Sequence, residues 1–103
     1  MPFHINILDK GDFLDVSLQG DLDINSSPQM SGELGEVYSK SPKNIIIDFK
    51  ELDYLDSTGL GALMSIYKKA KMDDNEIKII NARQNIKKLF YITDLDREFN
   101  LED

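Results

Sequence analysis

The length, the acidic charge and the absence of cysteine exclude several classes of protein for this chain. Its 103 residues fit one domain, and a formal net charge of −7 at pH 7 opposes binding to nucleic acid or to an anionic membrane. Without cysteine there is no disulfide framework, thiolate metal site or cysteine nucleophile. No apolar run approaches the roughly 20 residues of a membrane span. Residues 1–6 also lack the pattern of a secretory signal, so we expect a cytoplasmic protein.

The first part of the chain predicts an antiparallel hairpin. Apolar and polar residues alternate over residues 3–7 and again over residues 14–19, which is the spacing of strands with one face in water. Residues 9–12 between them read Asp-Lys-Gly-Asp, a composition typical of a turn. The segment Gly20–Asp23 is expected to end the second strand.

A helix is expected to begin near Ser27. The hydroxyl of Ser26 or Ser27 is suited to cap its first N–H groups, and Pro28 suits the first helical position. Gly32 and Gly35 each weaken a helix by about 1 kcal/mol relative to alanine, which predicts a solvent-facing or loosely held element. One apolar stripe follows from the helical spacing of four residues, Met30, Leu34, Val37 and Tyr38.

The remaining elements complete an α/β pattern. The run Asn44–Phe49 is short, apolar and β-branched, which predicts a strand buried on both faces. A second helix is expected from about Ser57 to Met72, a short strand at 77–80, and a third helix from about Gln84 to Thr93. The order β-β-α-β-α-β-α with a short extended tail predicts a single domain over residues 1–103, in which helices pack on a mixed sheet.

The chain is poorly supplied for catalysis. Its one histidine, His4, lies in the first expected strand, and a lone histidine is more often structural than catalytic. The stretch Gly59–Gly61 lacks the spacing of nucleotide phosphate-binding loops. We therefore expect no enzyme, cofactor or metal site. The least favoured alternative is a magnesium-dependent enzyme, since Mg²⁺ needs only one or two carboxylates and several aspartates stand at expected strand ends and turns: Asp21, Asp23, Asp48, Asp53 and Asp56.

The run Leu55–Leu63 is the most informative stretch. It lies where a buried strand is expected to pass into a helix, and it places Asp56 before two hydroxyl residues, Ser57 and Thr58. Helix N-termini offer unpaired N–H groups and a partial positive charge. Ser57 is therefore suited either to cap the helix or to carry a phosphate, and spacing alone favours the cap.

These segments resemble the bacterial anti-sigma-factor antagonists, members of the STAS domain family. The most specific match is Asp-Ser-Thr-Gly-Leu-Gly at residues 56–61. It is accompanied by Gly20–Asp23, by Ile45–Phe49 with Leu52, and by Asn85–Phe99, so that the match follows the family's order over nearly the whole chain.

The resemblance implies a role in partner switching. The unphosphorylated protein would bind an anti-sigma factor that is also a serine kinase and thereby free a sigma factor. Phosphorylation would separate the pair, and a phosphoserine phosphatase would reset it. The family's phosphorylated residue falls on Ser57. The partner-binding surface that the resemblance implies comprises Asp21, Asp23, Asp56, Ser57, Thr58, Gly59, Leu60 and Gly61. The alternative is a STAS scaffold or ligand-binding module that is never phosphorylated, in a sensory or transport assembly.

Elementary electrostatics agrees with a switch at Ser57. A phosphate adds about −1.5 to −2 charges, and we expect Asp21 and Asp23 to approach the neighbouring Asp56. A partner fitted to the uncharged hydroxyl would then meet a steric clash and a like-charge or desolvation penalty. Gly59 and Gly61 allow a partner backbone to come close, or they serve tight packing of the helix on the sheet, and both interpretations stay open.

Overall fold

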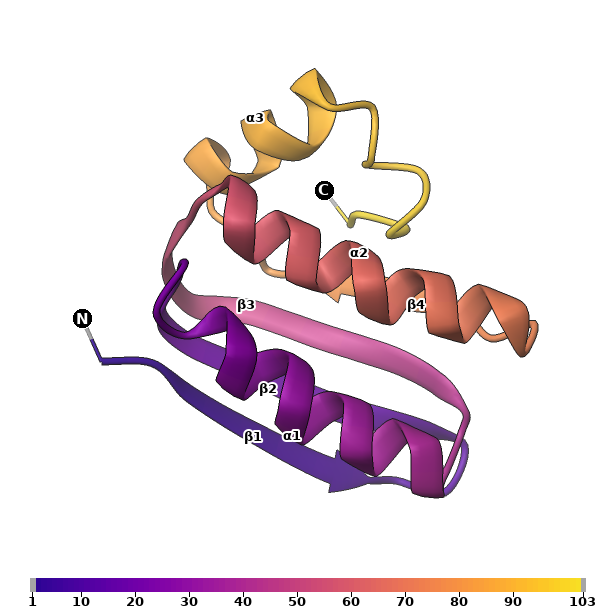
Figure 1. Ribbon diagram of the computed structural model, residues 1–103. Coiled ribbons are helices and arrows are strands. Elements are labelled where there is room, and N and C mark those ends of the chain that lie inside the picture. The colour runs from indigo at the N-terminus through magenta and orange to yellow at the C-terminus, as the bar shows by residue number, and fades with distance from the viewer. Residues whose placement is uncertain (1, 103) are drawn as a thin grey trace.

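The computed structural model describes residues 2–102, and its elements follow the expected order. That range contains four strands and three helices, and Figure 1 shows how they are arranged. In chain order they are β1 (His4–Asp9), β2 (Phe13–Leu22), α1 (Ser27–Lys40), β3 (Asn44–Leu55), α2 (Ser57–Met72), β4 (Ile77–Ile80) and α3 (Gln84–Ile92).

The strands form one mixed sheet, which confirms the expected fold. Its order is β1-β2-β3-β4; β1 pairs antiparallel with β2, whereas the β2–β3 and β3–β4 pairs are parallel. The hairpin turns at Gly11, whose φ of +89° suits glycine and whose N–H donates to the Asp9 carboxylate. The two parallel pairs follow from the α1 and α2 crossovers between their strands.

The helices pack on one face of the sheet and bury the core there (Figure 1). Ile45 and Ile47 of β3 are buried on that face, and Phe90 of α3 packs against Phe49 with ring centroids 6.2 Å apart. Ile46 and Asp48 point to the opposite face and are only half-buried. The expectation that this strand is buried on both faces is therefore wrong, because no helix of the described residues covers the second face.

Strand β3 is also longer than expected. It continues through Leu55, although Lys50 and Glu51 are exposed one after the other and break the alternation of a regular strand. The β2–β3 register shifts between Ser17 and Gln19, and again between Gly20 and Asp21. Such irregularities change the direction of side chains without ending the strand pairing. The strand predicted from the apolar pattern therefore ended too early.

The start of α1 differs from the expected cap. Neither serine makes a side-chain capping hydrogen bond. The Ser26 hydroxyl donates to the backbone oxygen of Asp21 (2.7 Å) and accepts from the N–H of Asp23 (2.9 Å). The Ser27 hydroxyl donates to the backbone oxygen of Asp23 (2.6 Å). Both hydroxyls therefore hold the β2–α1 loop against the helix, which fixes the position of residues 21–26.

Helix α1 is not loosely held. Gly32 is exposed, as expected, but Gly35 is buried. A Cβ at Gly35 would lie 3.5 Å from the Lys69 ammonium nitrogen of α2, so the glycine lies where the two helices face each other. Tyr38 joins them again, since its hydroxyl donates to the carboxylate of Asp73 at 2.8 Å.

The C-terminal tail covers the β4 edge of the sheet. The N–H of Ile79 donates to the oxygen of Phe99 (3.1 Å), and the N–H of Glu102 donates to the oxygen of Ile79 (3.0 Å). Phe99 is fully buried. An extended tail was expected. The tail is not extended throughout, because residues 96–100 form turns before it reaches the strand.

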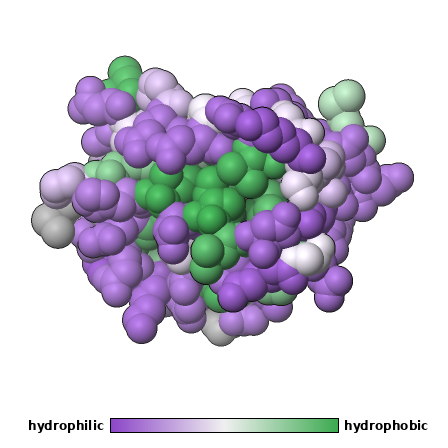
Figure 2. All heavy atoms as spheres, turned by 90° about the horizontal axis from the view of Figure 1, so that it is seen from below, coloured by the Kyte–Doolittle hydropathy of each residue, from purple (hydrophilic) through white to green (hydrophobic). Residues whose placement is uncertain are grey.

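The opposite edge of the sheet is β1. Figure 2 views the molecule from below, where β1 is the lowest strand of Figure 1, and shows apolar side chains gathered among hydrophilic ones. Ile5, Ile7 and Val37 line a shallow groove between β1 and α1, with Glu33 and Glu36 beside them. The groove leaves part of the apolar surface of β1 in contact with solvent.

Candidate functional site

The carboxyl ends of β2 and β3 lie side by side and carry the residues singled out in the sequence. Because the two strands are parallel, the segments that follow them leave the sheet at the same end, with Leu22 opposite Leu55. The N–H of Asp56 donates to the oxygen of Leu22 at 3.3 Å. The loop after β2 and the start of α2 are thus held together.

Asp56, not Ser57, caps α2. Its backbone is extended (φ −105°, ψ −177°), and its carboxylate accepts a hydrogen bond from the N–H of Gly59 at 2.8 Å. Its backbone oxygen accepts from the N–H of Leu60 at 2.9 Å. The interpretation of Ser57 as the N-cap is therefore wrong, since an aspartate one residue earlier satisfies the helix.

Ser57 is the first residue of α2, and its side chain is free to react. The residue is exposed, and its hydroxyl makes no hydrogen bond to another residue that the structure describes. Thr58 beside it is also exposed. The backbone N–H groups of Ser57 and Thr58 belong to the first turn of α2, where no intrahelical acceptor exists for them. An exposed hydroxyl beside unpaired N–H groups is a favourable place for an added anion.

The two glycines of α2 have different environments. Gly59 is buried, and a Cβ there would collide with the backbone oxygen of Leu22 and lie 2.8 Å from the Leu55 side chain. The geometry at Gly59 therefore favours the packing interpretation. Gly61 is exposed, and a Cβ there would meet nothing within 4 Å. Leu60 between them lies in the core with 8% of its surface exposed.

The loop after β2 is shaped by Asp23. One carboxylate oxygen of Asp23 accepts from the N–H groups of Asn25 (2.9 Å) and Ser26 (3.2 Å). Asp21 and Asp23 are half-buried and line a shallow hollow of about 390 Å³ together with Phe3 and Asn25. Leu22, between these two aspartates, accepts the hydrogen bond from the N–H of Asp56. The backbone of the acidic loop therefore lies beside the start of α2, as expected.

Two exposed apolar side chains near this edge were missed from the sequence. Ile24, in the turn between β2 and α1, is 66% exposed, and Tyr54, near the end of β3, is 50% exposed. Beside Tyr54, Asp53 forms an ion pair with Arg83 at 2.6 Å. An isoleucine inside an otherwise polar loop was the one available signal. Exposed apolar groups beside a polar site are common features of protein-binding surfaces.

No three histidine, aspartate or glutamate side chains of residues 2–102 gather in a way that could hold a metal ion. His4 is exposed on β1, which β2 separates from β3 in the sheet. No helix within residues 2–102 has the length and apolar character that a membrane crossing requires.

The fold and this site agree with one family of domains. The STAS domain model matches residues 4–103, and the chain belongs to that family. A protein named anti-sigma-B factor antagonist, from Staphylococcus aureus, is 28% identical over 95 residues, which are 92% of this chain and 88% of the relative.

Solved structures show the same arrangement. An anti-sigma factor antagonist from Mycobacterium paratuberculosis superposes with a TM-score of 0.83 at 25% identity, over 97% of this chain and 85% of that one. The Bacillus cell fate determinant SpoIIAA, in its phosphorylated form, gives a TM-score of 0.71 at 18% identity, over 99% of this chain and 90% of that one. At that identity the likeness to SpoIIAA concerns the fold alone.

Proposed function

We propose that this chain is an anti-sigma-factor antagonist that works by partner switching. Its unphosphorylated form binds an anti-sigma factor with serine kinase activity and so releases a sigma factor. Phosphorylation of Ser57 breaks the complex, and a phosphatase restores it. The names of its relatives support the class of function. The observation that carries the mechanism is the exposed Ser57 hydroxyl, which the Asp56 cap leaves without a structural task.

A phosphate on Ser57 suits the folded protein. Its oxygens would lie at the N-terminus of a 16-residue helix, close to the unpaired N–H groups of Ser57 and Thr58 and to the positive end of the helix dipole. The fold is therefore expected to survive modification. SpoIIAA, which has the same fold, has been solved in a phosphorylated form, which supports this expectation.

The same phosphate opposes the partner. Asp56, Asp21 and Asp23 already make this edge acidic, and the chain as a whole carries a net charge of −7. The partner would fit closely against the neutral Ser57 and Thr58, with the backbone at Gly61 open to close approach. Modification would add a large desolvation cost at the contact. Since 1.4 kcal/mol corresponds to a tenfold change in affinity, a penalty of a few kcal/mol suffices for a switch.

The other expected contact residues have supporting tasks in this proposal. Gly59 fixes the start of α2 against β2, and Leu60 anchors that turn in the core. Ile24 and Tyr54 add exposed apolar surface beside the polar site. In this proposal the protein acts by binding, not by catalysis.

The decisive experiment is a phosphorylation assay with a candidate anti-sigma kinase and ATP. Intact mass and peptide mapping should find one added phosphate on Ser57, together with loss of the complex. Ser57→Ala should bind and stay unmodified, whereas Thr58→Ala, the matched control, should still be phosphorylated. Full phosphorylation of Ser57→Ala would make the site assignment wrong. A stable complex in which no residue is phosphorylated would favour the STAS scaffold or ligand-binding module.

A further inference from the structure

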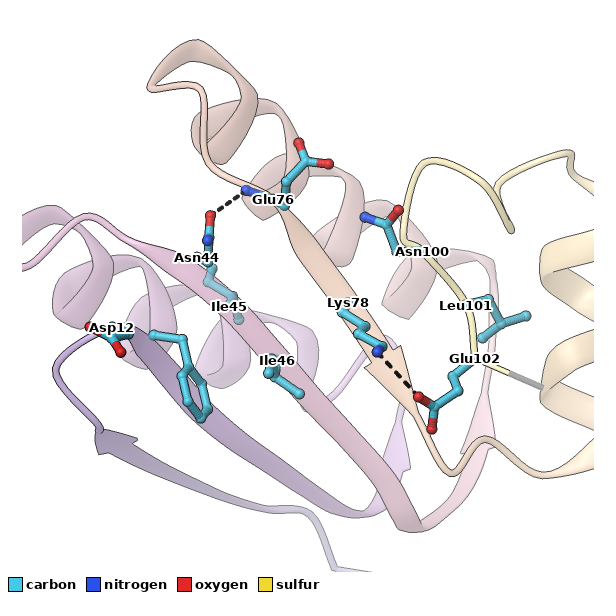
Figure 3. A pocket seen from close by; sticks show the side chains of 10 residues that line it. Asp12, Asn44, Ile45, Ile46, Glu76, Lys78, Asn100, Leu101 and Glu102 are labelled. Atoms are coloured by element: carbon cyan, nitrogen blue, oxygen red, sulfur yellow. Dashed lines mark hydrogen bonds and ion pairs between the residues drawn. The ribbon is translucent and has the colours of Figure 1, made fainter.

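The face of the sheet opposite the helices carries a cavity of about 680 Å³ (Figure 3). It lies over the starts of β2, β3 and β4, and residues 100–102 of the tail line one side of it. Ser57 follows the other end of β3, which runs from Asn44 to Leu55. At roughly 3.3 Å per residue the two ends of this strand lie on the order of 30 Å apart. The cavity is therefore separate from the proposed switch.

The floor of the cavity is apolar. Phe13, Ile46 and Leu101 come from three distant parts of the chain, and all three are half-buried. Ile46 points to this face because its neighbours Ile45 and Ile47 are buried under the helices. A sheet face that meets water usually carries polar residues. An apolar floor on an uncovered face indicates a surface that another molecule covers.

The rim of the cavity carries carboxylates, two of which are already paired. Glu102 forms an ion pair with Lys78 at 3.2 Å, and Glu76 forms one with Lys71 at 2.6 Å. Asp12 makes no ion pair with any residue that the structure describes, and Asp15 stands beside Ile46 in the β2–β3 register. The charged side chains that line the cavity are Asp12, Glu76, Lys78 and Glu102.

We propose that this cavity binds an amphipathic α-helix of a partner protein, with an apolar face flanked by lysine or arginine. Sheets of parallel strands, such as β2-β3-β4, normally bury both faces under helices, and here only one face is covered. Asp12 and Asp15, which make no ion pair with the described residues, select basic flanks. They disfavour a second copy of this chain, because both copies would bring the same unpaired carboxylates. The inference goes beyond the proposed switch and does not rest on it.

Two synthetic helical peptides test the proposal. Both are about 15 residues long, enough for measurable helix content, and share one leucine face; one carries lysine at the flanking positions and the other glutamate. Titration into isotope-labelled protein should shift the backbone amide signals of Phe13, Ile46 and Leu101 with the lysine peptide only. The amide signals of Ser57 and Thr58 should stay in place.

Matched variants locate the binding. Ile46→Thr keeps a β-branched side chain on the strand and should weaken the lysine peptide about tenfold, which is 1.4 kcal/mol. Asp12→Asn should weaken it about threefold and reduce its salt dependence. Asp94→Asn, at an exposed position beyond α3, should change nothing. Ser57→Ala should bind the peptide as the unaltered protein does, which separates this result from any failure of the switch.

Several outcomes would overturn the proposal. Equal binding of both peptides would remove the charge argument, and shifts centred on Ser57 would assign the peptide to the other surface. Unchanged affinity of Ile46→Thr, with its circular dichroism spectrum intact, would exclude the apolar floor. Sedimentation that shows a dimer broken by Ile46→Thr would replace the helix by a second copy. Decanol, a small apolar probe, shifting the same signals when neither peptide does would assign the cavity to a small ligand.

Discussion

The carboxylate of Asp56 accepts a hydrogen bond from the N–H of Gly59 at 2.8 Å, and this bond separates the stability of α2 from the chemistry of Ser57. The helix start is satisfied by a residue that is not the proposed target of modification. Ser57 can therefore change its charge without loss of the cap. A serine that served as both cap and target would lose its capping geometry on modification.

Removal of the cap should cost stability where removal of the target does not. We expect Asp56→Ala to lower the free energy of unfolding by about 0.5–2 kcal/mol, because the Gly59 N–H loses its acceptor. Ser57→Ala should change it by no more than about 0.5 kcal/mol, as for other exposed positions. Urea unfolding followed by circular dichroism measures both values. A larger loss for Ser57→Ala than for Asp56→Ala would contradict the assignment of the cap.

The two glycines of α2 should respond in opposite directions to alanine. At Gly59 the new Cβ collides with the backbone of Leu22, and overpacking of this kind costs about 1–3 kcal/mol. At Gly61 nothing lies within 4 Å, and better helix propensity should stabilise the protein by up to about 1 kcal/mol. Thermal unfolding of the two variants tests the pair. Weaker partner binding by a stable Gly61→Ala would support close approach of a partner backbone there.

A negative charge at the start of α2 should disrupt partner binding and leave the fold intact. Ser57→Asp places one carboxylate where the phosphate would lie, next to Asp56, and should weaken binding of the anti-sigma partner tenfold or more, which is about 1.4 kcal/mol. Ser65→Asp, at an exposed position later in the same helix, is the matched control. Isothermal titration calorimetry gives both affinities, and equal loss in the two variants would point to a general charge effect.

One exposed carboxylate should make a small contribution to acid sensitivity. The Lys43 ammonium, 2.8 Å from Asp9, and the Gly11 N–H hold the pKa of the Asp9 carboxyl below its ordinary value. A lowered folded-state pKa stabilises the protein above the unfolded-state pKa, about 3.9, and this stabilisation is lost as pH falls through the folded-state pKa.

Asp9→Asn should therefore flatten the fall of the urea midpoint below about pH 5. Asp12→Asn changes an exposed carboxylate of the same turn that makes no ion pair with the described residues, and it serves as the control. The effect should be modest, because Lys43 and Asp9 form their ion pair at the surface. The same flattening in both variants would remove Asp9 as its specific source.

Periodicity predicted the order of elements because each element repeats its own pattern. The alternation over residues 3–7 and the helical stripe from Met30 were correctly interpreted. Long-range pairing was not predictable in the same way. The register irregularity beside Lys50 and Glu51 lets β3 continue beyond the point at which its alternation breaks. The tail likewise bonds to β4, a partner that local sequence does not reveal.

The candidate site was partly predictable from topology. Parallel strands place the Gly20–Asp23 segment beside the start of α2, and the structure joins them through Leu22 and Asp56. The choice of cap was missed, since Asp56 and Ser57 are both good capping residues and only backbone geometry decides between them. Ile46 was predicted to lie in the core, but it lines the cavity on the uncovered face of the sheet. Its apolar character alone does not show which face of the sheet the helices cover.

The tail along β4 has a consequence for how copies of this protein can associate. A chain that joins others through its strands needs two open edges to build a filament. Residues 99–102 occupy the β4 side, so within the described residues only β1 offers a strand edge. Strand-to-strand association must then stop at a closed, two-fold pair. A sheet with one open edge can add one further strand there and cannot grow into a filament by strand addition.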